Sequence, residues 1–216
     1  MRTLAGLLAT GLLLSASAAV ADEPAQACVA ELLFEHRTGE LGLARVVGDQ
    51  KARFQPAPKV CATGDKRCLG RQYVVKGDVV VTGARRGGFT CAFFPNKTGG
   101  ADGWMPSSQL AVLPTTGTGG GWAGDWTRDD WASLRLTDAG AEIAVAGEAM
   151  WQGATPGAVH TGEIEGRARP VGDTLKVGDD NCKATLRRLG PYLAVSENGG
   201  CGGMNVSFTG VYRRGR

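Results

Sequence analysis

The sequence predicts an all-β protein with two small domains, and three observations support that fold class. The 216-residue chain contains 34 glycines, and its apolar segments are short and rich in valine, threonine and aromatic residues, as strands are. No long segment has the periodicity of an amphipathic helix. A glycine-rich stretch at residues 116–121 has the composition of a linker and separates two differently patterned halves. We therefore expect β-domains at residues 22–115 and 122–216.

The first 21 residues have the three parts of a secretory signal peptide. Arg2 is the positive n-region, residues 4–14 form an apolar h-region, and residues 19–21 have the small-x-small pattern that signal peptidase reads. The h-region is too short to span a bilayer as a stable helix, so cleavage after residue 21 is expected. A lipid anchor at Cys28 is the alternative, but an acidic segment separates this cysteine from the apolar run. The sequence predicts a periplasmic or secreted bacterial protein with no transmembrane anchor after cleavage.

Short strands and glycine turns alternate through the first half. Strands are expected at residues 43–47, 73–82 and 89–94, with a Gly-Asp turn inside the second strand and a glycine-rich turn at residues 83–88. A turn at residues 99–102 leads into Gly103-Trp104-Met105-Pro106 and then Leu110. This order predicts a small antiparallel β-domain.

Three segments of this half carry a family resemblance. They are Ala52-Arg53-Phe54-Gln55-Pro56, the Lys76-Gly77-Asp78 turn with its following strand, and Gly103-Trp104-Met105 with Leu110. On these segments, residues 44–113 resemble the bacterial Src-homology-3-type domain of exported proteins. The chain departs from that family in its Cys61–Cys68 insertion and in lacking a tryptophan near Phe93. The resemblance implies a small barrel that binds a component of the cell envelope.

The second half is a series of short strands separated by polar or glycine turns. They are expected at residues 133–137, 142–151, 159–171, 174–177, 183–189, 192–195 and 205–213. Consecutive strands with tight connections favour an up-and-down meander, and closing it into a barrel removes exposed edges. A second antiparallel meander β-barrel is therefore predicted.

Two segments of the second half also carry resemblances. Gly124-x-Trp126, before the first expected strand, and the late Tyr212-Arg213-Arg214 are similar in placement to the Gly-x-Trp start and closing arginine of lipocalin-like barrels. We expect Trp126 to close one end of the barrel. Residues 198–212 look like a C-terminal module of uncharacterised exported bacterial proteins, a resemblance that implies no activity.

Six cysteines remain after cleavage: Cys28, Cys61, Cys68, Cys91, Cys182 and Cys201. An even number in an oxidising compartment predicts three disulfides. Cys182 and Cys201 stand alone in the second half and are expected to pair, closing a loop of roughly 20 residues. The other four allow three connectivities, of which we favour Cys61 with Cys68 and Cys28 with Cys91. The alternative, a metal site, lacks both a C-x-x-C pair and a histidine at ligand spacing. No metal or cofactor is predicted.

The charge balance narrows the range of partners. Residues 22–115 carry 12 Lys+Arg against 9 Asp+Glu, and residues 116–216 carry 11 against 12. Neither half is basic enough to argue for nucleic acid. The slight basic excess of the first half permits an acidic partner, so peptidoglycan or another envelope protein is the expected class.

Motifs of catalysis are missing from the sequence. Paired cysteines leave no thiolate nucleophile, and the chain contains no Gly-x-Ser-x-Gly, Ser-x-x-Lys or His-Glu-x-x-His motif. Asp129 and Asp130 are adjacent, so on a strand or turn their carboxylates point apart rather than sharing a substrate. We predict no catalytic residues and no enzyme activity.

The candidate ligand-binding residues are Tyr73, Arg85, Arg86, Phe94, Trp104 and His160. A domain this small needs aromatic residues in its core, so Trp104 and either Phe89 or Phe93 are expected to be largely buried. Any aromatic residue left exposed beside Arg85 and Arg86 would form a patch for a peptide or a glycan stem that carries carboxylates.

His160 is assigned to a face by strand alternation. Residues 161, 163, 165, 167 and 169 are polar or charged, so His160 is expected to point inward with Gly162, Ile164, Gly166 and Ala168. Two interpretations follow. One is a buried histidine bonded to a carbonyl or a tyrosine hydroxyl, and the other is a polar contact in a ligand cavity that the small residues leave open.

These observations favour a non-enzymatic binding protein that recognises an envelope component through its first domain. One alternative is an inhibitor of an exogenous hydrolase such as lysozyme, with residues 198–204 as a rigid protruding loop held by Cys201. The other is a small-ligand carrier that uses the barrel interior near His160, for which a cavity is required.

Overall fold

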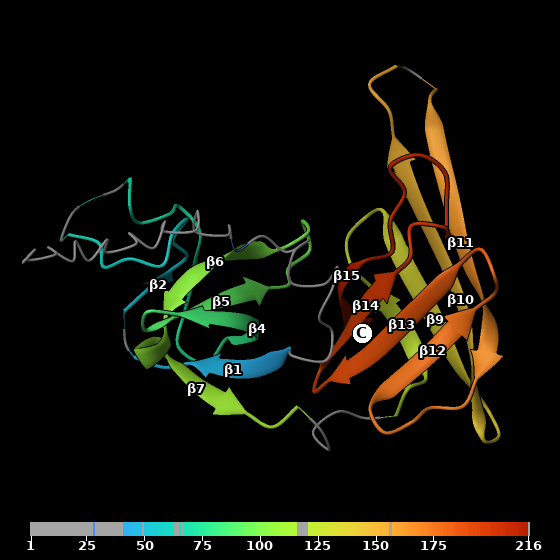
Figure 1. Ribbon diagram of the computed structural model, residues 1–216, viewed down its shortest axis with the longest axis horizontal. Coiled ribbons are helices and arrows are strands. Elements are labelled where there is room, and N and C mark those ends of the chain that lie inside the picture. The colour runs from blue at the N-terminus through green and yellow to red at the C-terminus, as the bar shows by residue number, and fades with distance from the viewer. Residues whose placement is uncertain are drawn as a thin grey trace, which may run out of the picture.

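The computed structural model describes residues 28, 41–48, 50–62, 65, 67–115, 121–155 and 157–215. The expected signal peptide and residues 116–120 of the expected linker lie outside this range. The predicted all-β class is confirmed, since two main antiparallel sheets account for most of the ordered backbone (Figure 1). None of the helices among these residues is long and apolar enough to cross a membrane.

The first sheet belongs to residues 42–113 and has five strands in the order β6-β5-β4-β1-β7. Its strands are β1 (Gly42–Val46), β4 (Val79–Arg86), β5 (Phe89–Phe94), β6 (Ala101–Pro106) and β7 (Leu110–Leu113). A 3₁₀ turn, η2 (Ser107–Gln109), joins the last two, and a separate two-stranded ladder pairs β2 (Ala52–Arg53) with β3 (Tyr73–Val74). We call this part of the chain the first unit.

The second unit is an eight-stranded sheet in the order β11-β10-β9-β8-β15-β14-β13-β12. Its strands are β8 (Gly124–Thr127), β9 (Ala132–Ala139), β10 (Glu142–Gln152), β11 (Val159–Ala168), β12 (Thr174–Gly178), β13 (Lys183–Leu189), β14 (Tyr192–Glu197) and β15 (Gly210–Arg214). Because β8 pairs with β15, the sheet curls into a nearly closed meander barrel, as predicted. Its interior is filled by side chains that include Trp126, Leu134, Leu136, Ile164, Leu186, Phe208 and Tyr212.

The barrel has a seam between β11 and β12, the two ends of the sheet. At Gly166 the two strands approach closely, since a Cβ there would lie 2.7 Å from the Val177 side chain. Farther along β11, the loop between β14 and β15 takes the place of a neighbouring strand, with Gly162 bridged to Gly202. The seam is thus covered by the chain's own loop.

All three predicted disulfides are present: Cys28–Cys91, Cys61–Cys68 and Cys182–Cys201. The first ties residue 28 to β5, and the second closes a small loop between β2 and β3. The third ties the turn between β12 and β13 to the loop that covers the seam.

Three predicted boundaries in the chain were wrong. The turn expected at residues 83–88 is confined to Gly87 and Gly88, whose positive φ angles of 50° and 83° suit a two-residue turn, and β4 continues to Arg86 through a bulge. The strand expected at residues 205–213 starts only at Gly210, since the Arg128 guanidinium binds the carbonyls of Ser207 and Thr209. The strand expected at residues 159–171 ends at Ala168.

Gly124-x-Trp126 was expected to precede the first strand of the second unit, but it belongs to a strand itself. Residues 124–127 form β8, which supplies the pairing that closes the barrel. Trp126 is buried in the barrel core; its expected place at one end of the barrel stays a prediction.

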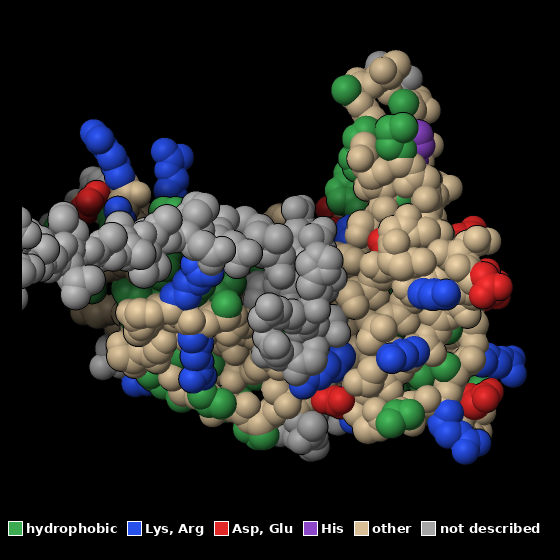
Figure 2. Space-filling model, viewed as in Figure 1, with side chains coloured by type: hydrophobic (Ala, Val, Ile, Leu, Met, Phe, Trp, Pro, Cys, Tyr) green, Lys and Arg blue, Asp and Glu red, His purple; other side chains and the backbone are tan. Residues whose placement is uncertain are grey.

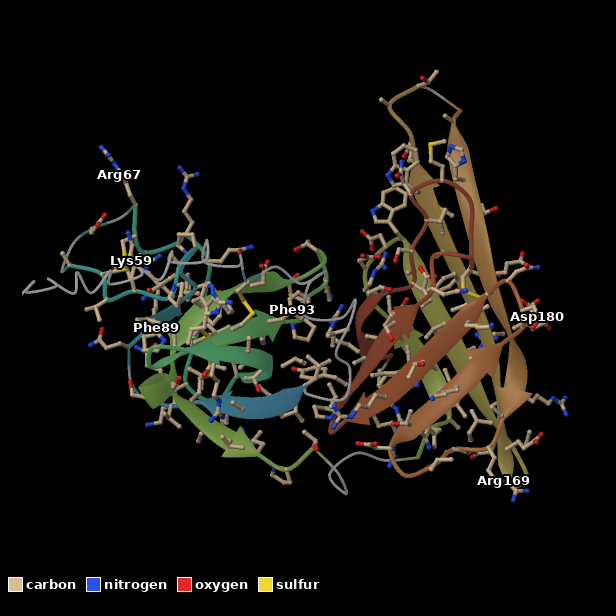
Figure 3. All side chains as sticks on the ribbon, viewed as in Figure 1. Lys59, Arg67, Phe89, Phe93, Arg169 and Asp180 are labelled. Carbon is tan, nitrogen blue, oxygen red and sulfur yellow. A yellow bond between two sulfur atoms is a disulfide. The ribbon has the colours of Figure 1, made fainter. Side chains whose placement is uncertain are left out.

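The two units share an apolar core. It joins Leu41, Leu43, Val81, Phe89, Phe93 and Trp104 of the first unit to Leu189, Ala194 and Val211 on the outer face of the barrel. Figure 3 shows Phe93 on the side of the first sheet that faces the barrel. Polar contacts cross the same boundary, because the Tyr192 hydroxyl donates to the Val79 carbonyl at 2.9 Å and Arg187 donates to the Leu41 carbonyl at 3.1 Å. The units are therefore packed against each other.

Candidate functional site

The predicted binding residues do not lie on one surface. Trp104 is 2% exposed and Phe89 and Phe93 are also buried, as expected, so Trp104 belongs to the core and cannot contact a ligand at the surface. Tyr73, by contrast, is 44% exposed, and Phe94 is partly exposed.

The cationic neighbours of Tyr73 are not the expected Arg85 and Arg86. The Lys51 ammonium lies 4.4 Å and the Arg53 guanidinium 5.8 Å from the centroid of its ring, both within the range of cation–π attraction. Arg85 and Arg86 lie instead at the end of β4, opposite the first residues of β5. Tyr73, Lys51 and Arg53 thus form a small aromatic and basic group around β2 and β3.

A groove of about 470 Å³ lies beside this group on the first unit. Its lining includes Gln55, Pro56, Arg67, Gly70, Arg71 and Asp102. Gln55 is only 6% exposed, and its Oε1 has no hydrogen-bond partner among the described residues. A buried amide oxygen without a partner forgoes a hydrogen bond that such a group usually makes in a folded protein.

The loop that borders this groove is held in place by short-range bonds. The Asp65 carboxylate accepts the backbone N–H groups of Arg67 and Cys68 at 3.0 and 3.1 Å, and the Cys61–Cys68 disulfide closes the same segment. Arg53 donates to the carbonyls of Gly70 and Arg71. Figure 3 shows Arg67 pointing away from the sheet into solvent. The loop therefore presents exposed guanidinium groups from a fixed backbone.

A second and larger cleft, about 760 Å³, lies between the two units. Phe93 and Gly99 line it from the first unit, and the barrel contributes the Arg128–Trp131 turn, the end of β10 and the loop before β15. Arg128 is fully engaged, since it bonds Asp129 at 2.9 Å as well as the loop carbonyls. Its bonds fix the turn and leave the apolar side chains of Trp131 and Met150 facing the cleft.

A β-hairpin projects beyond the barrel next to this cleft (Figure 1). The pairing of β9 with β10 ends at Ala132–Ala149, whereas β10 and β11 pair onward to Gln152–Val159. Residues 150–155 and 157–161 therefore extend past the other strands. Figure 2 shows hydrophobic side chains gathered on the side of this hairpin toward the first unit. Its exposed large hydrophobic residues are Met150 and Val159.

The loop at residues 198–204 does not protrude, contrary to the expectation for an inhibitor tip. Glu163 donates its N–H to the Cys201 carbonyl at 3.0 Å, and Gly203 donates to the Thr161 carbonyl at 3.1 Å. The absence of side chains at Gly162 and Gly202 allows the two backbones to meet, since a Cβ on Gly162 would lie 2.4 Å from the Cys201 oxygen. The loop is part of the barrel wall.

His160 lies on the face that alternation predicts. It is half-buried, shares its face with Gly162 and Ile164, and its ring lies 5.5 Å from that of Trp151. The interior room expected around Gly162 and Gly166 is filled by the seam loop and by Val177. Gly162 and Gly166 therefore make room for close packing rather than for a ligand.

Chemistry-bearing groups are scarce in the part of the chain that the structure describes. No group of three or more His, Cys, Asp or Glu is placed there to hold a metal ion, and all six cysteines are oxidised. Comparison of the chain with protein-family models, with curated proteins and with solved structures gave no match.

Sequence reasoning missed the apolar side chains beside the cleft. Alternation along residues 142–152 places Ile143 and Val145 inward and Met150 outward, so the signal for Met150 was present. The exposure of Trp131 had no such signal, because it depends on where the β9 ladder begins.

Proposed function

We propose that the chain is a non-enzymatic binding protein that recognises an anionic component of the bacterial cell envelope, with peptidoglycan as the expected ligand. The observation that carries the proposal is the groove of the first unit, whose lining brings the exposed residues Arg67 and Arg71 together beside Gln55. The resemblance of residues 44–113 to bacterial Src-homology-3-type domains supports the same assignment.

The groove offers groups that match a stem peptide of the cell wall. Guanidinium groups bind carboxylates through paired, charge-assisted hydrogen bonds, and a rotation of the Gln55 side chain would expose its oxygen to a peptide N–H. Tyr73, with Lys51 and Arg53 at its ring, extends the surface for a sugar or an aliphatic segment. The ligand is expected to carry both amide and carboxylate groups.

The proposal includes export to the periplasm or the medium. The signal-peptide pattern of the first 21 residues supports it, and three disulfides are compatible with it. The Gly-x-Trp and closing-arginine pattern of lipocalin-like barrels supports reading the second unit as a compact structural or binding module.

Co-sedimentation with purified peptidoglycan tests the proposal. Mature protein, residues 22–216, is expected to pellet with the polymer at low salt and to be released in part as salt rises, because ion pairs at an exposed groove are screened. Protein that stays in the supernatant at both salt concentrations contradicts envelope binding of this kind.

A second candidate function is inhibition of an exogenous hydrolase such as lysozyme. The observation that favours it is the projecting hairpin, whose exposed Met150 and Val159 form a narrow apolar edge of the kind that enters an enzyme cleft. Hydrolysis of a cell-wall suspension by lysozyme, measured with and without the protein, tests this function. Unchanged hydrolysis with excess protein excludes lysozyme as the target.

A further inference from the structure

The outer surface of β9, β10 and β11 joins exposed apolar groups to an excess of negative charge. Glu148 lies directly opposite Glu163 on β11, and the next outward residue on β10, Met150, donates its N–H to the Trp131 carbonyl at 2.9 Å. These residues line one shallow groove of about 290 Å³, together with Asp130. We call Asp130, Trp131, Glu148, Met150 and Glu163 the acidic–apolar face.

The apolar part of this face is not needed to build the barrel. Trp131 is 44% and Met150 45% exposed, whereas the inward neighbours Ala149 and Ile164 are buried in the core. Leaving apolar area in water forgoes the favourable free energy that its burial would supply. A tryptophan and a methionine exposed side by side therefore mark a contact surface.

The acidic part of the face opposes folding. Glutamates directly opposite each other on antiparallel strands repel, and Glu165 follows Glu163 on the same outward row. The guanidinium of Arg135 on β9 also attracts Glu148, but it is bonded to Asp125 at 2.7 Å and so balances the glutamates only in part. The pair of glutamates thus faces outward with a charge that a cation from another molecule would balance.

We propose that the acidic–apolar face is a docking site for a cationic segment of a partner protein. A lysine or arginine of the partner lies between Glu148 and Glu163, and an adjacent apolar side chain covers Trp131 and Met150. Charge complementarity selects this occupant, because phosphate backbones and anionic lipid surfaces are repelled by the same carboxylates. The exposed tryptophan and methionine favour a protein segment over a bare metal ion. This site is separate from the groove of the first unit, so it does not depend on peptidoglycan binding.

The test is a titration of the mature protein with the end-blocked peptide Lys-Thr-Leu-Thr-Lys, followed through the indole N–H signals in NMR spectra. In an extended peptide the two lysines and the leucine share one face, which matches the arrangement of the docking site. The Trp131 signal is assigned by its absence from the spectrum of Trp131→Phe. It is expected to shift as the peptide is added and to stop shifting when the site is saturated. The control peptide Glu-Thr-Leu-Thr-Glu is expected to leave it unchanged.

Three variants separate this site from nonspecific attraction. The double variant E148Q/E163Q is expected to weaken binding by about tenfold, and Met150→Thr to weaken it severalfold. The control D138N/E142Q removes the same charge at the other end of β9 and β10 and is expected to bind as the unmodified protein does. An absent shift at millimolar peptide, or equal weakening by the control and by E148Q/E163Q, overturns the proposal.

Discussion

The guanidinium of Arg214, on the last strand, lies 4.8 Å from the centroid of the Trp126 ring on the first strand of the barrel. Gly124, two residues before this tryptophan, has a φ of 142°, a backbone conformation that favours glycine. Arg214 also bonds the Gly121 carbonyl, and the Trp126 indole donates to the Trp122 carbonyl at 3.1 Å. The β8–β15 pairing spans only Thr127–Arg213 and Trp126–Arg214, so these side-chain contacts reinforce a short ladder.

Replacing this arginine therefore tests how the barrel is closed. Arg214→Ala is expected to lower the free energy of unfolding by about 1 kcal/mol, the scale of an exposed cation–π contact with one hydrogen bond. Urea unfolding followed by tryptophan fluorescence measures it. Arg169→Ala, exposed beyond the end of β11, is the control and should change stability by less than about 0.5 kcal/mol. Equal effects of the two variants would show that Arg214 does not reinforce the ladder.

Removal of the Cys182–Cys201 disulfide tests the role of the seam loop. The two residues are 19 apart in the chain, and loss of a cross-link of that span destabilises by about 3 kcal/mol in the chain-entropy model. C182S/C201S is expected to unfold at lower urea, with faster amide exchange at Gly203, which bonds Thr161 across the seam. C61S/C68S, whose cysteines are 7 apart, should lose less stability and leave exchange at Gly203 unchanged. Slow exchange at Gly203 in C182S/C201S would contradict this role.

Tyr192 makes stability depend on alkaline pH. Burial between the two units raises the pKa of Tyr192 to about 12 from its usual 10.0, and burial also raises the pKa of Tyr212. Because the folded-state pKa is the higher one, the unfolded chain loses its proton first, so stability is full below pH 10 and falls as pH rises toward 12. Tyr192→Phe removes the bond to Val79 and is expected to flatten this dependence. Urea unfolding between pH 9 and 12 measures it, and an unchanged slope in the variant would count against the assignment.

The paired glutamates of the acidic–apolar face predict a gain in stability on mutation. Glu148→Gln removes the repulsion from Glu163 and is expected to stabilise the barrel by about 0.5 kcal/mol at low salt, with a smaller gain at high salt because the charges are exposed. The thermal midpoint at two salt concentrations measures this. Glu142→Gln, at the far end of the same strand, serves as the control. A loss of stability in Glu148→Gln would mean that the carboxylate has a stabilising partner.

The strand pattern predicted much of the fold because alternation and turn residues act locally. The bounds of β5 and β13 match the residues expected from sequence, and the inward face of His160 follows from alternation alone. The three disulfides followed from the even cysteine count and from chain separation.

The features that the sequence did not predict depend on contacts between segments that are far apart in the chain. From the sequence alone, the missing side chains of Gly162 and Gly166 suggest open space inside the barrel. In the structure, a loop packs on Gly162 and a strand packs on Gly166, and both need the room that glycine leaves. The interface between the units had a local signal in Leu193-Ala194-Val195, where apolar residues on both faces of β14 are fully buried. The groove beside Gln55 had none, since it forms where β6 meets a loop distant in the chain.

Co-sedimentation of matched arginine variants tests envelope recognition by the first unit most directly. R67A/R71A removes two guanidinium groups from the groove, and R167A/R169A removes two exposed ones from the barrel, so the net charge of the two variants is equal. The account predicts that the fraction pelleted with peptidoglycan at low salt falls at least about fivefold for R67A/R71A and stays at the level of the unmodified protein for R167A/R169A. Equal retention of both variants would contradict recognition through the groove.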